Sequence, residues 1–170
     1  MQFIKILALD VGTEESGYCL LDNYSYKPLS FGKVKNEELL QLVKEEDYDI
    51  LVYEKFACYG MAVSQTVFQS VEWNGRYIQS ALDRGKDIQA IFRKDEKINL
   101  CGTMKAKDTN IRQALIDRFA KFDFKNGKGT KNNPDFFYGF SKDMWSAYAV
   151  GITYLDRRNK WNITYIKALI

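Results

Sequence analysis

Residues 6–22 read ILALDVGTEESGYCLLD, the most informative segment for predicting the architecture. An apolar run ends in a carboxylate at Asp10, a turn bounded by Gly12 and Gly17 follows, and a second apolar run begins at once. Two β-favouring runs separated by a glycine-containing turn are typical of antiparallel strands. The segment therefore predicts a β-hairpin whose first strand carries an acid at its end.

The remainder of the chain alternates strands with helices. Strands are expected over residues 3–10, 17–21, 27–34, 49–54 and 88–92, with a strand end over 98–101, and helices after a cap at Asn36 and over 62–84, 105–122 and 141–155. Gly32 is a candidate bulge. Strands reached through helical crossovers should run parallel to the first. The order predicts an α/β fold with a mixed sheet, a three-strand antiparallel meander plus parallel strands, flanked by helices.

Length and composition favour one globular domain. The chain has 170 residues and is 46% hydrophobic, enough for a core. We expect the domain to span residues 1–158, with 159–170 as a tail in which a short strand and a helix both fit. The sequence shows no signal-peptide pattern and no apolar run of the ~18 residues that a membrane helix needs, so a cytoplasmic protein is expected.

The sequence contains three cysteines and no histidine. Cys19, Cys58 and Cys101 lack the spacing of a disulfide framework or a zinc site, so buried reduced thiols are expected. The absence of histidine excludes Ser-His and Cys-His nucleophile pairs and histidine-ligated zinc. Hydrolytic chemistry would have to use carboxylates and metals, and oxygen-rich sites suit Mg²⁺ or Mn²⁺.

Charge is distributed unevenly along the chain. Residues 1–83 carry 7 Lys/Arg against 13 Asp/Glu, whereas residues 84–142 carry 14 against 7. A basic segment beside an acidic one indicates a phosphate-binding surface next to a metal-binding site. An ordinary solvated surface remains the alternative.

Two of the predicted strands end in acids, Asp10 and Glu54. If these strands are central and parallel, both carboxylates emerge at the sheet edge where open α/β sheets place ligands. Asp143, at the start of a helix, could join them. Converging acids repel each other, and divalent cations relieve this; two cations ~4 Å apart can activate a water and stabilise a leaving oxyanion.

Each acid also has a structural interpretation when taken alone. Asp10 could form a turn, Glu54 could pair with Lys55 or a distant arginine, and Asp143 could interact with its helix dipole. The joint pattern is what favours catalysis.

The hairpin resembles the opening of the RNase H-like superfamily. Its DVGT element is also similar to the phosphate-binding hairpin of actin, Hsp70 and sugar kinases, and to YqgF-type nucleases. The segments DILVYEKF (49–56), GTMKAKDTNIRQAL (102–115) and SKDMWSAYAVGITYL (141–155) resemble, in order, segments of the RuvC-type Holliday junction resolvases. This resemblance extends over residues 1–155.

The resemblance implies a set of site residues. Asp10, Glu54 and Asp143 match three catalytic acids that hold metal, two Mg²⁺ or Mn²⁺ ions, and Lys107 matches a basic residue near the scissile bond. The fourth family acid falls on Ser146, whose hydroxyl is a weak neutral ligand. Either Ser146 acts through water, or an acid such as Asp135 replaces it. A third register makes Asp143 the last acid and leaves Phe140 at the other position.

The resemblance also implies DNA contacts and a homodimer. An aromatic side chain after Glu54 stacks on bases in the family, and base stacking contributes about 1–3 kcal/mol per base. Dimerisation uses the long helix over 62–84, where Phe68, Trp73 and Tyr77 could face a partner or the core. The candidate DNA-binding residues are Phe56, Tyr59, Lys97, Lys105, Lys107, Lys128 and Lys131, with Arg93 and Lys94 as weaker candidates for phosphate contact.

The implied activity is metal-dependent hydrolysis of Holliday junctions and related branched DNA. The resemblance further implies 5′-phosphate ends, and the Lys-, Asn- and Tyr-rich divergence favours a phage-encoded protein acting in the host cytoplasm. Two alternatives stay open: a branched-DNA-binding protein with weakened catalysis, and a YqgF-type RNA-processing nuclease. A sugar kinase or chaperone ATPase is disfavoured, because those need two such domains.

Overall fold

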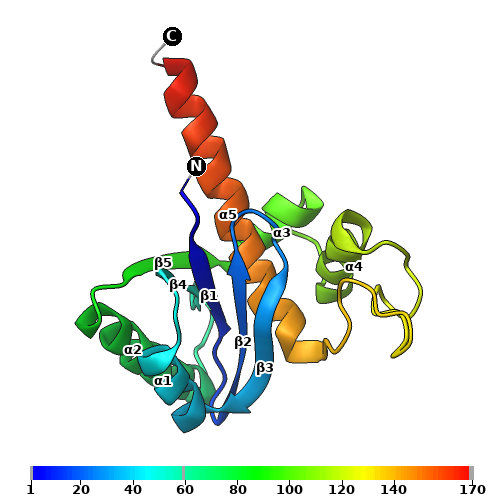
Figure 1. The fold of residues 1–170 in the computed structure, drawn as a ribbon. Helices are drawn as coiled ribbons and strands as arrows, with labels where there is room; N and C mark the ends of the chain where they lie inside the picture. Colours follow the sequence, from blue (N-terminus) through cyan, green and yellow to red (C-terminus); the bar gives the residue numbers. More distant parts are fainter. Residues whose placement is uncertain (1, 59, 169–170) are drawn as a thin grey trace.

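The computed structural model describes residues 2–58 and 60–168, with side chains described up to residue 160. Tyr59, one of the predicted base-stacking residues, lies outside the described residues. In this part of the chain, five strands form one sheet and five helices accompany it (Figure 1). They are β1 (Lys5–Asp10), β2 (Glu15–Asp22), β3 (Pro28–Lys35), α1 (Asn36–Glu45), β4 (Ile50–Lys55), α2 (Gln65–Asp83), β5 (Asp87–Phe92), α3 (Arg93–Cys101), α4 (Asp108–Phe119) and α5 (Lys142–Ala168).

The sheet has the order β3-β2-β1-β4-β5, with β1 at its centre. β2 pairs antiparallel with both β1 and β3, whereas β4 runs parallel to β1 and β5 runs parallel to β4. The predicted meander plus parallel strands is therefore confirmed. Because β1 and β4 are parallel neighbours, Asp10 and Glu54 lie at the same edge of the sheet.

Helices cover both faces of the sheet, which explains why β1 is apolar at four consecutive positions, Ile6–Leu9. Successive side chains of a strand point to opposite faces. Leu7 and Leu9 pack toward α1 and α2, while Ile6 and Ala8 pack toward α5. α5 crosses the second face and continues past the sheet, with α3 and α4 beside it (Figure 1). No helix in the described part of the chain has both the length and the apolarity to span a bilayer.

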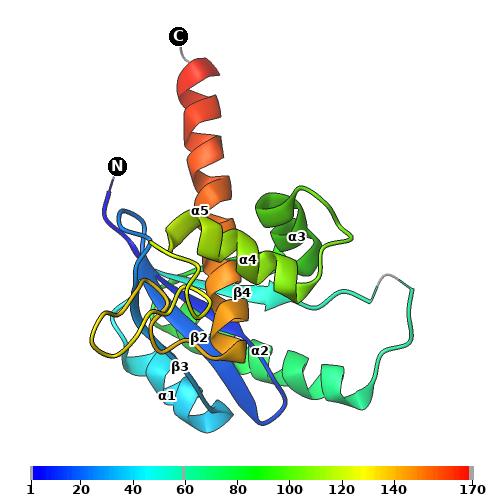
Figure 2. The same cartoon turned by 90° about the vertical axis from the view of Figure 1, so that its right-hand side faces the viewer.

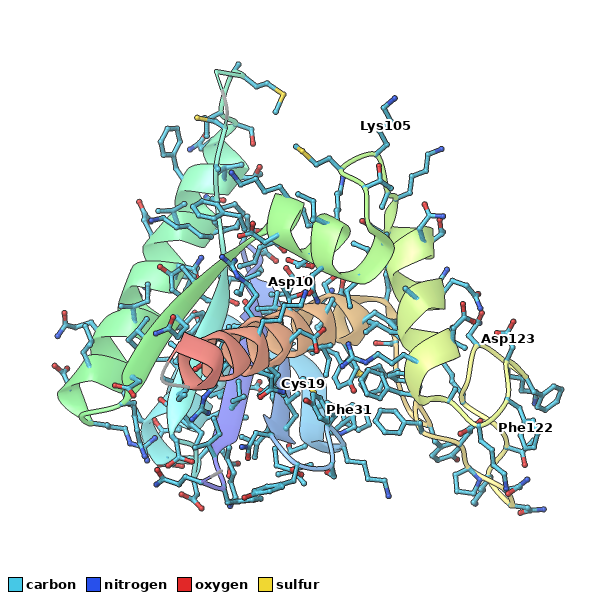
Figure 3. All side chains as sticks on the ribbon, turned by 90° about the horizontal axis from the view of Figure 1, so that it is seen from above. Asp10, Cys19, Phe31, Lys105, Phe122 and Asp123 are labelled. Atoms are coloured by element: carbon cyan, nitrogen blue, oxygen red, sulfur yellow. The ribbon has the colours of Figure 1, made fainter. Side chains whose placement is uncertain are left out.

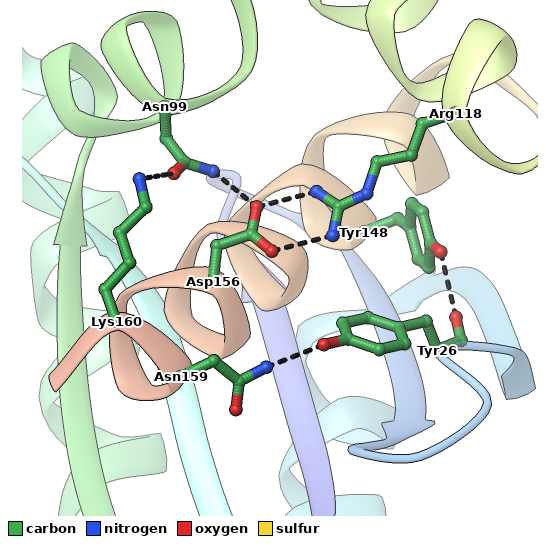
Figure 4. Close-up of polar contacts among 7 residues, drawn as sticks. All are labelled: Tyr26, Asn99, Arg118, Tyr148, Asp156, Asn159 and Lys160. Carbon is green, nitrogen blue, oxygen red and sulfur yellow. Dashed lines mark hydrogen bonds and ion pairs between the residues drawn. The ribbon is translucent and has the colours of Figure 1, made fainter. Parts of the chain in front are cut away.

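Polar contacts fasten α3 and α4 to α5 (Figure 4). Both carboxylate oxygens of Asp156 accept from the Arg118 guanidinium of α4 at 2.7 Å. One of them also accepts from the Asn99 amide of α3 at 2.7 Å. The Tyr148 hydroxyl donates to the Tyr26 carbonyl at 2.8 Å, which ties α5 to the turn between β2 and β3. The helix that carries Asp143 and Ser146 is thus held on several sides.

The close packing of α5 on the sheet depends on Gly151. A Cβ atom there would lie 2.8 Å from Leu21 Cδ2 and 3.1 Å from Ala8 Cβ. We expect Gly151→Leu to destabilise the fold by about 1–3 kcal/mol through overpacking, measured by urea unfolding. Gly75→Ala is the control, because nothing lies within 4 Å of that position in α2; a gain of up to about 1 kcal/mol is expected there. Equal stability of Gly151→Leu and the parent protein would contradict this packing.

Several expectations about local structure are wrong. Residues 98–101 are the last turn of α3 rather than a strand end, because a helix starts directly after β5, where the Phe92 amide donates to the Asp95 carboxylate at 3.3 Å. The irregularity in the meander lies at Leu20/Leu21 of β2, not at Gly32. Cys58 is exposed and Cys101 half-buried, so only Cys19 is the buried thiol expected.

Asn36 does not cap α1 with its side chain. It is buried, accepts from the Ser16 hydroxyl at 2.5 Å and donates to the Gly12 carbonyl at 3.1 Å, so it braces the β1–β2 turn. Tyr77 faces the core, where its hydroxyl donates to the Asn36 carbonyl at 3.1 Å, whereas Phe68 is 59% exposed. The last predicted helix extends to Ala168, so the helical interpretation of the tail is confirmed over the described residues.

Candidate active site

The sequence-predicted acids meet at one edge of the sheet. Asp10 ends β1, Glu54 lies one residue before the end of β4, and Asp143 lies in the first turn of α5. Gly17 allows this approach, because a Cβ atom there would lie only 2.7 Å from the Asp143 carbonyl oxygen. On the other side, the Asn74 amide of α2 donates to the Glu54 backbone carbonyl at 3.3 Å. Elements from both faces therefore position the acids.

The Asp10 carboxyl is largely shielded from water and lies near a second acid, Asp143. Burial raises the pKa of its carboxyl above the ordinary value, the Arg93 charge opposes this, and the Asp143 charge adds to it. The Ser146 hydroxyl lies close enough to hydrogen bond the Asp10 carboxylate. Ser146 thus stands beside the acids, at the position where the resemblance places a fourth one.

Glu54 is only 21% exposed in its side chain. Burial raises its pKa to about 7; Arg93 lowers it, whereas the neighbouring Asp10 charge raises it further. Lys97 also lowers the Glu54 pKa, which places this predicted DNA-binding lysine close to the acid.

Two further acids, not among the predicted site residues, surround Arg93. Its Nη1 atom lies 2.6 Å from Glu96 Oε2 and 3.9 Å from Glu54 Oε2, and its Nη2 atom donates to the Asp108 carboxylate. Glu96 is fully buried, and burial together with the Glu54 charge raises its pKa to about 9. The only sequence signal was the charged run RKDE over 93–96, which is typical of an exposed helix start.

A second cation, Lys33 of β3, pairs with Asp143. Its Nζ atom lies 3.0 Å from the Asp143 carboxylate and 3.3 Å from that of Glu15. Lys33 and Arg93 therefore neutralise the acids from opposite sides. Neither was predicted to do so, although Arg93 was a candidate for phosphate contact.

The donor set of this edge suits a hard divalent cation. All four acids would ligate a metal through carboxylate oxygens, the donors found in Mg²⁺ and Mn²⁺ sites: Asp10, Glu54, Asp143 and Glu96. The buried Oε1 atom of Glu96 has no hydrogen-bond partner, and such an atom normally has one. Within residues 2–58 and 60–168, no three such groups lie close enough together to hold a metal as they stand. The acids are instead paired with Arg93 and Lys33.

Two pockets open beside the acids, and Asp143 borders both. One, of about 350 Å³, is lined by Asp10, the β1–β2 turn and Lys33. The other, of about 180 Å³, is lined by cationic, hydroxyl and acidic side chains together with two apolar ones: Arg93, Asp108, Thr109, Ile111, Arg112, Lys142, Asp143, Trp145 and Ser146. Cations and hydroxyls beside carboxylates suit a phosphodiester next to a metal-binding site.

The predicted DNA-binding residues are spread around this edge. Lys107 is exposed and directly precedes α4, next to Asp108. Lys105 projects outward from the α3–α4 connection (Figure 3). Phe56 is half-buried at the start of the segment between β4 and α2, which extends away from the body of the molecule (Figure 2). Lys128 and Lys131 lie in the connection between α4 and α5, whose labelled residues are distant from Asp10 in Figure 3.

Asp135 does not replace the fourth acid, and Phe140, the residue of the third register, does not lie at the site. The Asp135 carboxylate accepts from the backbone amides of Lys121 and Phe122, both at 2.9 Å, and so organises the loop after α4. Phe140 is buried in the aromatic core. Neither residue lines the pockets beside Asp10.

The buried acids predict a pH dependence of stability for the metal-free protein. Glu54 and Glu96 have folded-state pKa values of about 7 and about 9, above the ordinary 4.5. The folded state therefore binds protons that the unfolded chain has released, and stability present below about pH 4.5 is lost as the pH rises through these values. We expect the unfolding free energy in chelator to fall from about pH 5 to about pH 9, and the fall to be smaller in Glu96→Gln. A flat profile in the parent protein would contradict this.

Comparisons with solved structures agree with this architecture. RuvC from Thermus thermophilus aligns with a TM-score of 0.64 and 13% identity, over 92% of this chain and 96% of that chain. T. thermophilus RuvC in complex with a Holliday junction substrate gives 0.62 and 14%, over 88% and 92%. The yeast mitochondrial Holliday junction resolvase Ydc2 gives 0.57 and 11%, over 97% and 84%.

No protein-family model and no curated protein sequence matches the chain. The structural likeness nevertheless covers most of each chain compared, and it includes the mixed five-stranded sheet with its central β1. The chain has the RNase H-like fold of the RuvC-type resolvases.

Proposed function

We propose that the protein is a metal-dependent endonuclease that resolves Holliday junctions and related branched DNA. The observation that carries this proposal is the convergence of Asp10, Glu54 and Asp143 at one edge of an RNase H-like sheet. The solved structures with this fold are named as RuvC and as Holliday junction resolvases, and one contains a Holliday junction substrate.

Asp10, Glu54 and Asp143 are the residues that would hold Mg²⁺ or Mn²⁺ in this proposal. A bound divalent cation supplies a Lewis acid for the phosphoryl oxygens and lowers the pKa of water. The chain's own contribution is to exclude bulk water from Glu54 and to orient the phosphodiester. Arg112 and Lys142 line the smaller pocket and Lys107 directly precedes α4, and these three cations would supply positive charge toward the phosphate.

The same proposal assigns the outer residues to DNA binding. Lys97, whose charge acts on Glu54, and Lys105 and Lys107, which precede α4, would contact the backbone near the cut, while Lys128 and Lys131 would contact a more distant arm. Phe56 and Tyr59 would stack on bases at the branch point. A homodimer with two-fold symmetry would present two such sites to a two-fold junction.

The decisive experiment incubates the purified protein with synthetic four-way, three-way and linear DNA, with Mg²⁺, Mn²⁺ or chelator, and maps the product ends. We expect metal-dependent cuts confined to the branched substrates. Binding of the four-way junction without cutting in either metal would favour the second candidate, a branched-DNA-binding protein. That candidate is supported by the serine at position 146 and by the pairing of Glu54 and Asp143 with internal cations. Cutting of linear DNA at the same rate would contradict both.

Ser146 allows a direct test of metal use. Its hydroxyl already lies next to the Asp10 carboxylate, so Ser146→Asp would add a second carboxylate from α5. We expect this change to lower the Mg²⁺ concentration needed for half-maximal cleavage by about 10-fold or more, the scale on which groups around a metal alter its affinity. Titrations of Mg²⁺ and Mn²⁺ against cleavage measure the effect, with Ser146→Ala as the control. Identical titration curves for all three proteins would contradict a role for this position.

A further inference from the structure

Glu96 is a buried carboxylate with one unused oxygen. The side chain is fully buried in the first turn of α3. Its Oε2 atom accepts from Arg93 Nη1 at 2.6 Å, and its Oε1 atom has no hydrogen-bond partner. Desolvating an acceptor without a partner costs about 1–3 kcal/mol, and more for a charged group. The salt bridge to Arg93 uses Oε2, so it does not explain why the Oε1 atom is buried without a partner.

The position of Glu96 connects it to the predicted acids. β5, which pairs with β4, leads directly into α3, so Glu96 stands beside the end of β4 that carries Glu54. The electrostatic effects of both Glu54 and Asp10 reach Glu96. Arg93 contacts Glu54 and Glu96 with the same Nη1 atom, at 3.9 Å and 2.6 Å. A single positive charge therefore stands between two carboxylates of the site.

We propose that Glu96 is the fourth carboxylate of this site and supplies from α3 the acid that α5 lacks at Ser146. In the metal-free protein, the Arg93 guanidinium takes the place of the cation. This inference rests on the proposed metal-dependent function. It identifies a ligand outside the positions that the family resemblance points to.

Arg93 has a second carboxylate partner, Asp108, which can hold its guanidinium if the contact with Glu96 is lost. Its Nη2 atom already contacts Asp108, whose side chain is 80% exposed at the start of α4. The Arg93 side chain is 28% exposed and borders the smaller pocket. A divalent cation between Glu54 and Glu96 would displace Nη1, while the contact of Nη2 with Asp108 keeps the arginine at the pocket. There its charge would face the DNA phosphate rather than the acids.

The test is Mn²⁺ binding to the metal-free protein, measured by electron paramagnetic resonance of the free ion and independent of cleavage. We expect Glu96→Gln to weaken Mn²⁺ binding by about 10- to 100-fold, or to remove one bound ion, and Arg93→Gln to tighten it. Asp47→Asn is the control, since it removes an exposed acid that pairs with Lys5 at the opposite end of β1 and leaves the site in place; unchanged Mn²⁺ binding is expected.

The outcomes separate the inference from the proposed function. If the parent protein binds Mn²⁺ and cuts junctions, and Glu96→Gln binds Mn²⁺ with unchanged affinity and number, the inference is overturned and the nuclease proposal stands. If the parent protein neither binds Mn²⁺ nor cuts, the proposed function fails first. Should Glu96→Gln not fold, as judged by circular dichroism, Glu96→Asp keeps the charge with a shorter reach. Weaker Mn²⁺ binding by that folded variant supports the inference, and unchanged binding overturns it.

Discussion

Asp10→Asn is expected to slow junction cleavage by at least about 100-fold, the scale of losing one charge-stabilising group in an active site. The substitution keeps the size of the side chain and its contact with Ser146, but removes the negative charge at the end of β1. Glu54→Gln, at the neighbouring strand end, is expected to have an effect of the same size. Single-turnover cleavage of a labelled four-way junction measures both.

Binding must be followed in the same experiment. The affinity of both variants for the junction, measured in chelator, is expected to stay within a few-fold of the parent protein, because the cations that would contact phosphate are unchanged. Asp47→Asn is the matched control: this exposed acid pairs with Lys5 at the opposite end of β1, and full activity is expected. Loss of binding together with cleavage would indicate that Asp10 and Glu54 have a structural role instead.

Arg93→Met is expected to cause the largest loss of stability. It leaves Glu96 fully buried without its only charged hydrogen-bond partner among the described residues. Removing one partner of a buried ion pair typically costs about 3–5 kcal/mol. Because the pKa of Glu96 is raised to about 9, protonation can relieve the buried charge, so the loss should be greatest above about pH 9 and smaller near about pH 6. Urea unfolding in chelator at these two pH values measures it.

A double variant shows whether the pair itself is responsible. Replacing both partners of a buried pair with apolar side chains is often neutral or stabilising. Arg93→Met combined with Glu96→Leu should therefore recover most of the stability that Arg93→Met loses. If Arg93→Met costs less than about 1 kcal/mol at both pH values, or if the double variant is no more stable, Arg93 is not the group that compensates Glu96.

The strands and the two acids at their ends could be predicted from the sequence. Residues 6–9 are apolar at consecutive positions because both faces of β1 are covered, and an acid follows at Asp10 because the strand leaves the core there. Parallel pairing of β1 with β4 follows from the intervening helix, and it brings Asp10 and Glu54 to one edge without any knowledge of packing.

Tertiary structure alone decided which other groups meet those acids. Glu96 belongs to a charged run that resembles a solvated helix start, and only the placement of α3 beside β4 and β5 turns it inward. In the sequence, Lys33 is one residue of the strand β3 and nothing local indicates its partner. It pairs with Asp143 because Gly17 lets α5 approach β2. The sequence is compatible with a Tyr77 side chain that faces the core or a partner, and the hydrogen bond from its hydroxyl to the Asn36 carbonyl places it in the core.

The mixed sheet and the shared edge of Asp10 and Glu54 thus follow from the sequence, because hydrophobic periodicity and strand ends are local properties of the chain. The identity of their neighbours, Arg93 between Glu54 and Glu96 and Lys33 beside Asp143, was decided by tertiary structure. Those contacts join residues far apart in the chain, or depend on which face of α3 turns inward, and a buried charge has no local pattern that distinguishes it from an exposed one.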